Sequence, residues 1–319
     1  MVEASAIDGD SPEGTLVQGG VIPGTRKPAF TLLMREDLPI PVVLATPHSG
    51  RTYPAVVRSA MRDPEYSSIR LEDRFVDLVA QRVANDTGAS LLVANAPRAM
   101  LDLNRSPEDV DWSMIHDANQ PDTVRHSAAN RRARSGLGLI PRRLSGLGEI
   151  WNKPLSHAEL QARIRQIHTP YHTALAETLQ MVRDRWGAAL LVDVHSMPPL
   201  KRSRHDDVPA HFVLGDRFGA SANDRIVASA IRYFADEGAG VAHNRPYAGG
   251  YVLDTHAAVQ NGIHAIQIEV CRSTYLDARR EQLSPKAASL VKLLAGLVQD
   301  LGAMTARMMG RGDLRNAAE

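Results

Sequence analysis

The sequence predicts an α/β protein with a largely parallel central sheet. Short, continuous apolar runs of strand length, such as Pro41–Thr46 and Ser90–Ala94, alternate with segments whose apolar residues recur at helical spacing. Continuous apolar character indicates strands buried on both faces, which is typical of parallel sheets covered by helices. The chain has no internal repeat and no Pro/Ser-rich linker, so we expect one domain over residues 27–319.

Residues 1–26 are acidic and rich in small residues, and we expect them to form a flexible segment. They lack the basic and apolar stretches of a signal peptide. Five strands are predicted after this segment, in chain order: Pro41–Thr46, Ser90–Ala94, Ala188–Val194, His211–Leu214 and Gly262–Val270. The three clearest helical patterns cover Glu72–Asp86, His157–Trp186 and Ser284–Leu301.

Each predicted helix carries local signals for its position. In the first, one face holds the apolar side chains of Phe75, Leu78, Val79 and Val83, and Gly88 follows where a helix stops. The long second pattern should break or kink near Thr169–Pro170, because proline removes a backbone donor. The third has Pro285 near its first turn, where proline is well tolerated.

Residues 123–152 are rich in Arg and Gly and show little apolar periodicity. A segment of this length without elements of its own is typical of a functional or mobile loop. Its arginines would suit a nucleic acid, but stacking aromatic residues are not interleaved, and the chain balances 37 Lys and Arg against 36 Asp and Glu. We therefore expect a solvated or substrate-covering loop near the site, and no nucleic-acid partner.

The composition restricts the kind of metal site that the chain can build. A single cysteine excludes an internal disulfide, a Cys-rich zinc site and an iron–sulfur cluster, so any metal must be bound by His and carboxylate ligands. The sequence also has no apolar run of the roughly 20 residues that span a bilayer. We expect a cytoplasmic protein with no membrane partner.

Titratable side chains follow or end four of the predicted strands. Ligands bind at the carboxyl ends of strands in open α/β sheets, so these side chains should share one site. A buried carboxylate is costly unless it is paired or has a function, and four such strand ends together favour a site over isolated structural residues. The residues are His48, Arg98, Asp102, Asn104, Arg105, His195, Glu269 and Arg272.

This set of residue types points to amide hydrolysis. Two His and one carboxylate bind zinc with a position left open for water. A separate Glu can accept a proton from that water and pass it to a leaving amine. An Asn-Arg pair offers amide and guanidinium donors that suit a substrate carboxylate. The sequence therefore predicts hydrolysis of an amide bond next to a carboxylate.

Eight motifs, in order from about Val42 to Tyr275, resemble the N-formylglutamate amidohydrolase (formylglutamate deformylase) family. They are PHSG, LEDRFVD, DLNR, PYH, DVHS, VLGDRFGAS, AGGY and IHAIQIEVCRSTYL. DLNR is also similar to the wider zinc-carboxypeptidase clan, which includes aspartoacylase and succinylglutamate desuccinylase. The resemblance implies a three-layer α/β/α fold with a central mixed, largely parallel sheet, and one Zn²⁺ or other divalent metal per chain. It also implies a small N-acyl amino acid as substrate and a role in histidine catabolism.

The resemblance further implies a role for each candidate residue. The implied metal ligands are His48, Asp73 and His195, and Glu269 is the implied general base and proton shuttle. Arg98 would stabilise the oxyanion, and Asp102 would hold His48 by its other ring nitrogen. The implied binders of the substrate carboxylates are Asn104, Arg105 and Arg272.

One departure from the clan concerns the carboxylate ligand. Carboxypeptidases and aspartoacylases carry His-x-x-Glu, but the residue three beyond His48 is Arg51, which cannot bind a metal. The carboxylate ligand must therefore come from elsewhere, and the family resemblance implies an acid at the start of the following helix. Asp73 is the best match and Glu72 is an alternative, and we expect either to lie at the exposed N-terminal end of that helix.

Three functions remain open from the sequence. The first is removal of an N-formyl or other N-acyl group from an acidic amino acid. The second is a carboxypeptidase-like or other N-acyl-amino-acid or peptide amidohydrolase, since a fold does not fix a substrate. The third is a non-catalytic binding paralogue, against which the complete candidate set argues. For Tyr171 and His172, on the long helix, a structural role is at least as plausible as a catalytic one.

Overall fold

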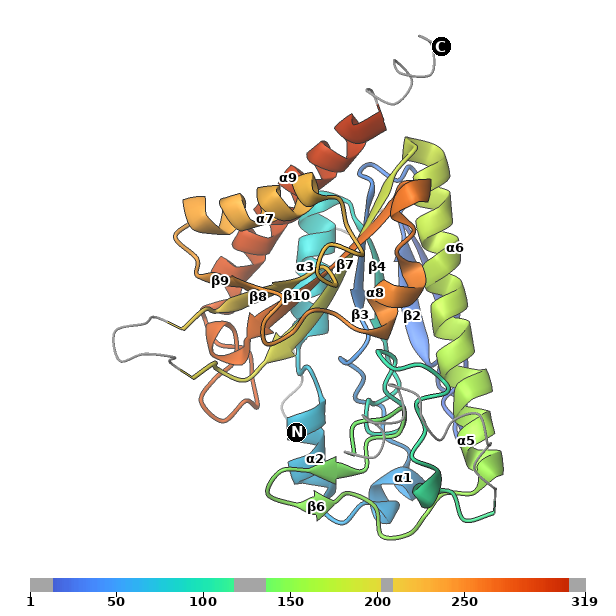
Figure 1. Cartoon of the computed structure of the whole chain (residues 1–319). Coiled ribbons are helices and arrows are strands. Elements are labelled where there is room, and N and C mark those ends of the chain that lie inside the picture. The colour runs from blue at the N-terminus through green and yellow to red at the C-terminus, as the bar shows by residue number, and fades with distance from the viewer. Residues whose placement is uncertain (1–13, 118–135, 202–208, 310–319) are drawn as a thin grey trace.

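The computed structural model describes residues 14–117, 136–201 and 209–309 (Figure 1). Its centre is an eight-stranded sheet with the order β1-β2-β4-β3-β7-β10-β8-β9. The strands are β1 (Thr15–Gly19), β2 (Phe30–Met34), β3 (Val42–Thr46), β4 (Ser90–Ala94), β7 (Ala189–Met197), β8 (Phe212–Gly215), β9 (Val241–His243) and β10 (Ile263–Cys271).

The four central strands, β4, β3, β7 and β10, are parallel to one another. Antiparallel pairs flank them, because β2 runs against β4 on one side and β8 runs against β10 on the other. The predicted mixed, largely parallel sheet is therefore confirmed. All five predicted strands are present, and the carboxyl ends of β3, β4, β7 and β10 lie at the same edge of the sheet.

Helices cover both faces of the sheet and make it the middle of three layers (Figure 1). Apolar side chains of the sheet pack on one face against α3 (Val76–Thr87), α7 (Asp224–Asp236) and α9 (Ala287–Met309). On the other face they pack against α6 (Thr169–Trp186) and α8 (Tyr251–His256), and Val57 of the short α1 (Ala55–Ala60) belongs to the same apolar cluster. This arrangement confirms the expected three-layer α/β/α fold.

Among the described residues, α9 is the one helix that is long and apolar enough to cross a membrane by length and composition alone. Half of that stretch is buried inside the protein. Its side chains pack on the sheet and on α3 and α7, and Leu297 and Leu301 are fully buried. The helix therefore serves as a core helix of the fold.

The long helical pattern is divided in three, as the proline signal predicts. It consists of α5 (His157–Arg163), one π-helical turn (Ile164–His168) and α6. Pro170 has no N–H to donate to the carbonyl of Gln166, and that carbonyl instead accepts a 2.9 Å hydrogen bond from the N–H of Val21. The interruption thus attaches the N-terminal segment to the long helix.

Two expectations about element boundaries were wrong. Thr15–Gly19, within the segment expected to be flexible, forms the edge strand β1, which pairs along its whole length with β2. The helix expected from Glu72 starts only at Val76, and Leu78 is 39% exposed instead of facing the core. Phe75 takes a left-handed backbone conformation just before that helix, which turns the chain into it.

Part of the Arg/Gly-rich segment expected to be a loop, up to residue 135, lies outside the described residues. The remainder, from Gly136, contains a short hairpin of β5 (Arg143–Leu144) and β6 (Gly148–Glu149). Leu139, Ile150 and Trp151 are buried in the apolar cluster that also contains residues of α5 and α6. This part is therefore packed in places and not a wholly solvated loop, while a position over the substrate stays a prediction.

Candidate active site

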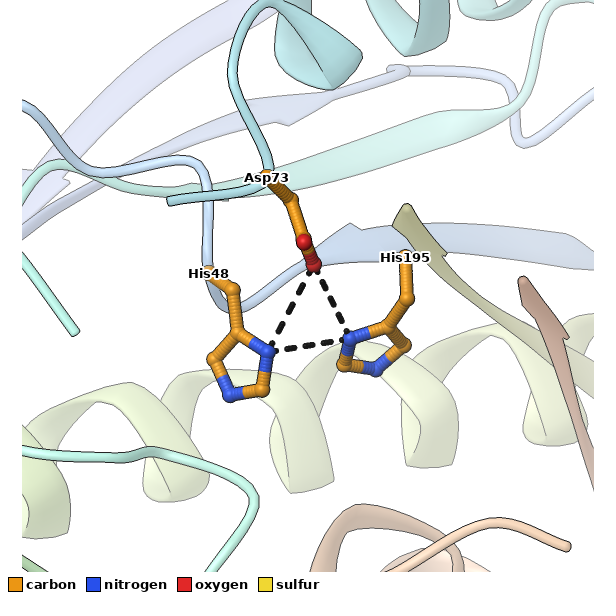
Figure 2. Close-up of side chains that lie close together, drawn as sticks. All are labelled: His48, Asp73 and His195. Carbon is orange, nitrogen blue, oxygen red and sulfur yellow. Dashed lines mark hydrogen bonds and ion pairs between the residues drawn. The ribbon is translucent and has the colours of Figure 1, made fainter. Parts of the chain in front are cut away.

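Three side chains from distant parts of the chain converge at the carboxyl edge of the sheet (Figure 2). His195 Nδ1 lies 3.0 Å from His48 Nδ1 and 3.2 Å from Asp73 Oδ2, and His48 Nδ1 lies 3.5 Å from the same oxygen. Each of the three residues is only 2% exposed. The geometry is that of three ligand atoms facing one point.

Each member of this triangle is positioned by a different element. His48 follows β3 after a single proline, and His195 lies near the carboxyl end of the adjacent strand β7. Asp73 lies in the short connection between α2 (Pro64–Leu71) and α3, where its N–H donates to the carbonyl of His48 at 2.9 Å. That backbone hydrogen bond ties the Asp73 connection to the loop after β3.

A carboxylate holds the second ring nitrogen of each histidine. Asp102 Oδ1 lies 2.6 Å from His48 Nε2, and Asp193 Oδ2 lies 2.8 Å from His195 Nε2. A carboxylate partner favours a protonated Nε2, which leaves the lone pair of each Nδ1 directed into the triangle. The contact between Asp102 and His48 is the one that the family resemblance implies.

The second oxygen of Asp73 is also held. Its Oδ1 accepts a 3.0 Å hydrogen bond from Ser196 Oγ and lies 3.4 Å from a guanidinium nitrogen of Arg272. Burial alone raises the pKa of Asp73, but hydrogen bonds with His195 and His48 hold that pKa well below its ordinary value. The carboxylate is therefore ionised and fixed in orientation.

These donors fit a divalent cation. Two imidazole lone pairs and a carboxylate oxygen that face one another in a dry site repel unless positive charge lies between them. Burial alone would lower the pKa of His195. The negative charge of Asp193, and the hydrogen bonds that His195 makes with Asp193 and Asp73, instead raise this pKa well above its ordinary value. The site therefore stabilises positive charge, and two His with one carboxylate is the composition of a catalytic zinc site.

Glu269 lies beside this triangle on β10. Its Cα pairs in register with that of His195 on β7, so both side chains project from the same face of the sheet. Burial, with the opposing influence of His195 and the added repulsion of Asp73, raises the pKa of Glu269 to about 7. A carboxyl with this pKa can both accept and return a proton near neutral pH.

The structure places Arg98 at the same edge. Its Nε donates to Asp102 Oδ2 at 2.9 Å, and its side chain is a quarter exposed. Asp102 thus bridges Arg98 and His48 through its two oxygens. The guanidinium is held in place on one side while it keeps further N–H donors.

The three residues expected to bind carboxylates have contacts within the protein. Asn104 bonds to Val252 and Gln267 through its side-chain amide. Arg105 donates to the carbonyls of Asn104 and Leu137. Arg272 donates to Ser196 Oγ and to the carbonyls of Ile69 and Glu72. Their roles in substrate binding stay predictions.

The two candidate acids at the start of α3 are separated by the structure. Both Glu72 and Asp73 are buried, at 2% exposure, so the expectation of an exposed helix end was wrong. Asp73 supplies the carboxylate of the triangle. The side chain of Glu72 pairs with Arg74 instead, with Glu72 Oε2 3.3 Å from Arg74 Nε. Arg51, which replaces the acid of the clan motif, forms a two-pronged ion pair with Asp77 at 2.8 and 2.7 Å.

Three further residues of the site have no role assigned from the sequence. Asp193 holds His195, Ser196 holds Asp73, and Gln267 donates to Glu269 Oε1 at 3.0 Å. A strand places residues i and i+2 on one face. Asp193 and Gln267 could therefore have been found as the polar residues two before His195 and Glu269 in otherwise apolar runs.

Comparisons with known proteins agree with the family resemblance seen in the sequence. The model of a family described as N-formylglutamate amidohydrolase matches residues 40–276. A protein of Pseudomonas aeruginosa named N-formylglutamate deformylase is 28% identical over 251 residues, which cover 75% of this chain and 83% of that protein. A protein of the same name from Pseudomonas putida is 28% identical over 269 residues, covering 81% and 92%.

Solved structures agree with the family match. The crystal structure of N-formylglutamate amidohydrolase from Ralstonia eutropha JMP134 superposes with a TM-score of 0.77 at 29% identity, covering 88% of this chain and 99% of that one. A gene product of Agrobacterium tumefaciens has the same fold, with a TM-score of 0.55 at 18% identity, covering 86% and 94%.

Proposed function

The chain belongs to the N-formylglutamate amidohydrolase family, and we propose that it hydrolyses the formamide bond of N-formyl-L-glutamate to formate and L-glutamate. The observation that carries this proposal is the buried His48–Asp73–His195 triangle beside Glu269 at the carboxyl edge of the sheet. It combines a site for a divalent cation with a carboxyl whose pKa suits proton transfer. This activity fits histidine catabolism, and we assign the enzyme to the cytoplasm.

His48, Asp73 and His195 would hold one divalent cation, which we propose to be Zn²⁺. When bound, such a cation lowers the pKa of water and polarises a carbonyl oxygen. Asp102 and Asp193 fix the rings, so that each histidine presents its Nδ1 without losing side-chain entropy when the metal binds.

Glu269 acts as the general base and then as the general acid. One of its oxygens accepts a proton from the attacking water, and the proton is then given to the α-amino nitrogen as the C–N bond breaks. Burial makes this exchange feasible, because a carboxyl with a pKa of about 7 is neither too weak a base nor too weak an acid at neutral pH.

Arg98 and Arg105 supply the positive charge for the substrate. Arg98, oriented by Asp102, would donate to the oxyanion that forms when the formyl carbonyl is attacked. Arg105, at the end of the Asp102–Arg105 segment, would bind a carboxylate of the amino acid. Their guanidinium groups explain how a chain of nearly zero net charge can select a small dicarboxylate.

The test compares turnover of N-formyl-L-glutamate, N-formyl-L-aspartate and a peptide with a free C-terminus by the purified, metal-loaded chain. We expect the highest kcat/KM for N-formyl-L-glutamate. Arg105→Ala should raise KM for the dicarboxylic substrates much more than it lowers kcat. Hydrolysis of the peptide alone would favour the carboxypeptidase-like alternative, and binding of N-formyl-L-glutamate without turnover would favour the non-catalytic one.

A further inference from the structure

Both ends of the Asn104 side-chain amide make a hydrogen bond inside the protein. Its Oδ1 accepts a 2.9 Å hydrogen bond from the N–H of Val252, at the start of α8, and its Nδ2 lies 3.3 Å from Gln267 Oε1. Gln267 Nε2 in turn donates to Glu269 Oε1 at 3.0 Å. We propose that Asn104 and Gln267 are positioning residues that hold the general base Glu269 in its working orientation, an inference that rests on the proposed hydrolase function.

The direction of this chain of hydrogen bonds is fixed by a backbone group. The N–H of Val252 can only donate, so the oxygen of the Asn104 amide must face it and the NH₂ must face Gln267. Gln267 therefore presents its oxygen to Asn104 and its NH₂ to Glu269. A carboxylate oxygen can only accept, so every partner in the chain is matched.

Burial makes these hydrogen bonds strong enough to orient a side chain. Gln267 is 3% exposed and Asn104 is 7% exposed, so water cannot replace their partners, and an unpaired amide there would be costly. Among the residues that the structure describes, Gln267 is the only one recorded as donating to Glu269. With one oxygen held, the other is left to exchange the proton.

The position of Asn104 is itself determined by the AGGY segment, which otherwise has no role in the chemistry. A Cβ on Gly250 would lie 2.6 Å from Asn104 Oδ1, so only glycine allows this turn to approach the amide. The N–H of Arg217 donates to the carbonyl of Ala248, and its Nε donates to Asp254. These two hydrogen bonds attach the loop after β8 to the segment that carries the N–H of Val252.

The long helix supports the same segment from its other side. His172 Nε2 lies 3.0 Å from the carbonyl of Leu103, and His168 Nε2 lies 3.0 Å from that of Arg105. These two carbonyls flank Asn104 in the sequence. The histidines therefore act on the backbone of the DLNR motif, which gives His172 the structural role that the sequence left open.

This arrangement differs from direct binding of a substrate by Asn104. The bond to Gln267 uses one of the two N–H groups of the Asn104 amide and leads to the general base, so the positioning role does not depend on contact between Asn104 and the substrate. The two roles have different kinetic signatures. A binder contributes mainly to KM, whereas a positioning residue contributes to kcat through the base that it orients.

The test measures kcat and KM for N-formyl-L-glutamate in Gln267→Met and Asn104→Ala. We expect each to lower kcat by roughly 10- to 100-fold with KM nearly unchanged, because a small displacement of a reacting group has effects of this size. Thr178→Val, which removes a buried hydroxyl within α6, is the matched control and should keep wild-type kcat. If a variant fails to fold, Gly250→Ala displaces the amide while every polar group remains, and should also lower kcat.

A double-mutant cycle with Glu269→Gln separates the outcomes. If Gln267 acts through Glu269, adding Gln267→Met to Glu269→Gln lowers the residual rate no further. The proposal is overturned if the two substitutions reduce the rate independently, so that their fold-changes multiply. It is also overturned if Gln267→Met keeps a wild-type kcat, or if Asn104→Ala raises KM with a normal kcat. Failure of the proposed function itself looks different, because the wild-type chain would then not turn over N-formyl-L-glutamate.

Discussion

At the residue scale, the proposed mechanism requires the buried Glu269 to be a carboxyl group. We expect Glu269→Gln to keep the metal and to lower kcat by roughly 10²–10⁴-fold, because the amide cannot accept the proton of water. Metal content by elemental analysis and steady-state kinetics check this together. Near-normal turnover with metal bound would exclude Glu269 as the general base.

The pH dependence of the same residue gives a second residue-scale prediction. In the proposed mechanism Glu269 accepts a proton only when it is ionised, and burial raises its pKa to about 7, so kcat/KM should fall as pH decreases through that pKa. A bound cation favours the ionised form, so the midpoint of the acid limb should lie at or below about 7. The remaining activity of Glu269→Gln should not show this fall of kcat/KM at acidic pH. An identical limb in that variant would assign it to another group.

The neighbouring residues Asp73 and Glu72 allow a direct test of which carboxylate binds the metal. Asp73→Ala should lose the metal, because its Oδ2 completes the triangle with both histidines. Glu72→Ala should keep it, because Glu72 pairs with Arg74 outside the triangle. Metal content of the two purified variants decides between them, and the reverse result would mean that Glu72 is the ligand.

The sequence was informative about residues that end strands and less so about those in connections. His48 and His195 stand out because parallel strands bring their carboxyl ends together. Asp73 lies in a connection whose path depends on α2 and on the left-handed turn at Phe75, so only the family resemblance pointed to it. The internal bonds of Asn104 and Arg272 depend on contacts between segments more than 100 residues apart, which no local pattern reports.

At the element scale, buried strands and strongly signalled helix ends were predictable. The edge strand β1 was not, because its side chains are mostly exposed and its sequence is short, so no periodic pattern marks it.

The start of α5 shows how local a helix signal can be. Ser156 and Glu159 form a complete capping box, in which each side chain bonds to the backbone of the other.

This cap gives an element-scale prediction that is independent of the chemistry. Ser156→Ala should lower the free energy of unfolding by about 1 kcal/mol, because it leaves a backbone donor of the first turn without its partner. Urea unfolding measures the effect. Ser59→Ala, an exposed serine that bonds only to a carbonyl within its own short helix, is the control and should change stability much less. Equal losses in the two variants would contradict the assignment of the cap.

At the scale of the whole molecule, the three-layer fold brings four separate segments to one edge. β3, β7 and β10 deliver His48, His195 and Glu269, and the connection before α3 delivers Asp73. A cation that binds this assembled site, and not the unfolded chain, should stabilise the fold. Chelation should therefore lower the melting temperature of the wild type and leave that of Asp73→Ala unchanged.

We propose that a metal held by this triangle and the base beside it perform the hydrolysis together. The most direct measurement is to add Zn²⁺ stepwise to the metal-free chain and follow the release of formate from N-formyl-L-glutamate. We expect negligible turnover without metal and a rate that rises to a plateau at about one Zn²⁺ per chain. Full activity in the metal-free chain would contradict it.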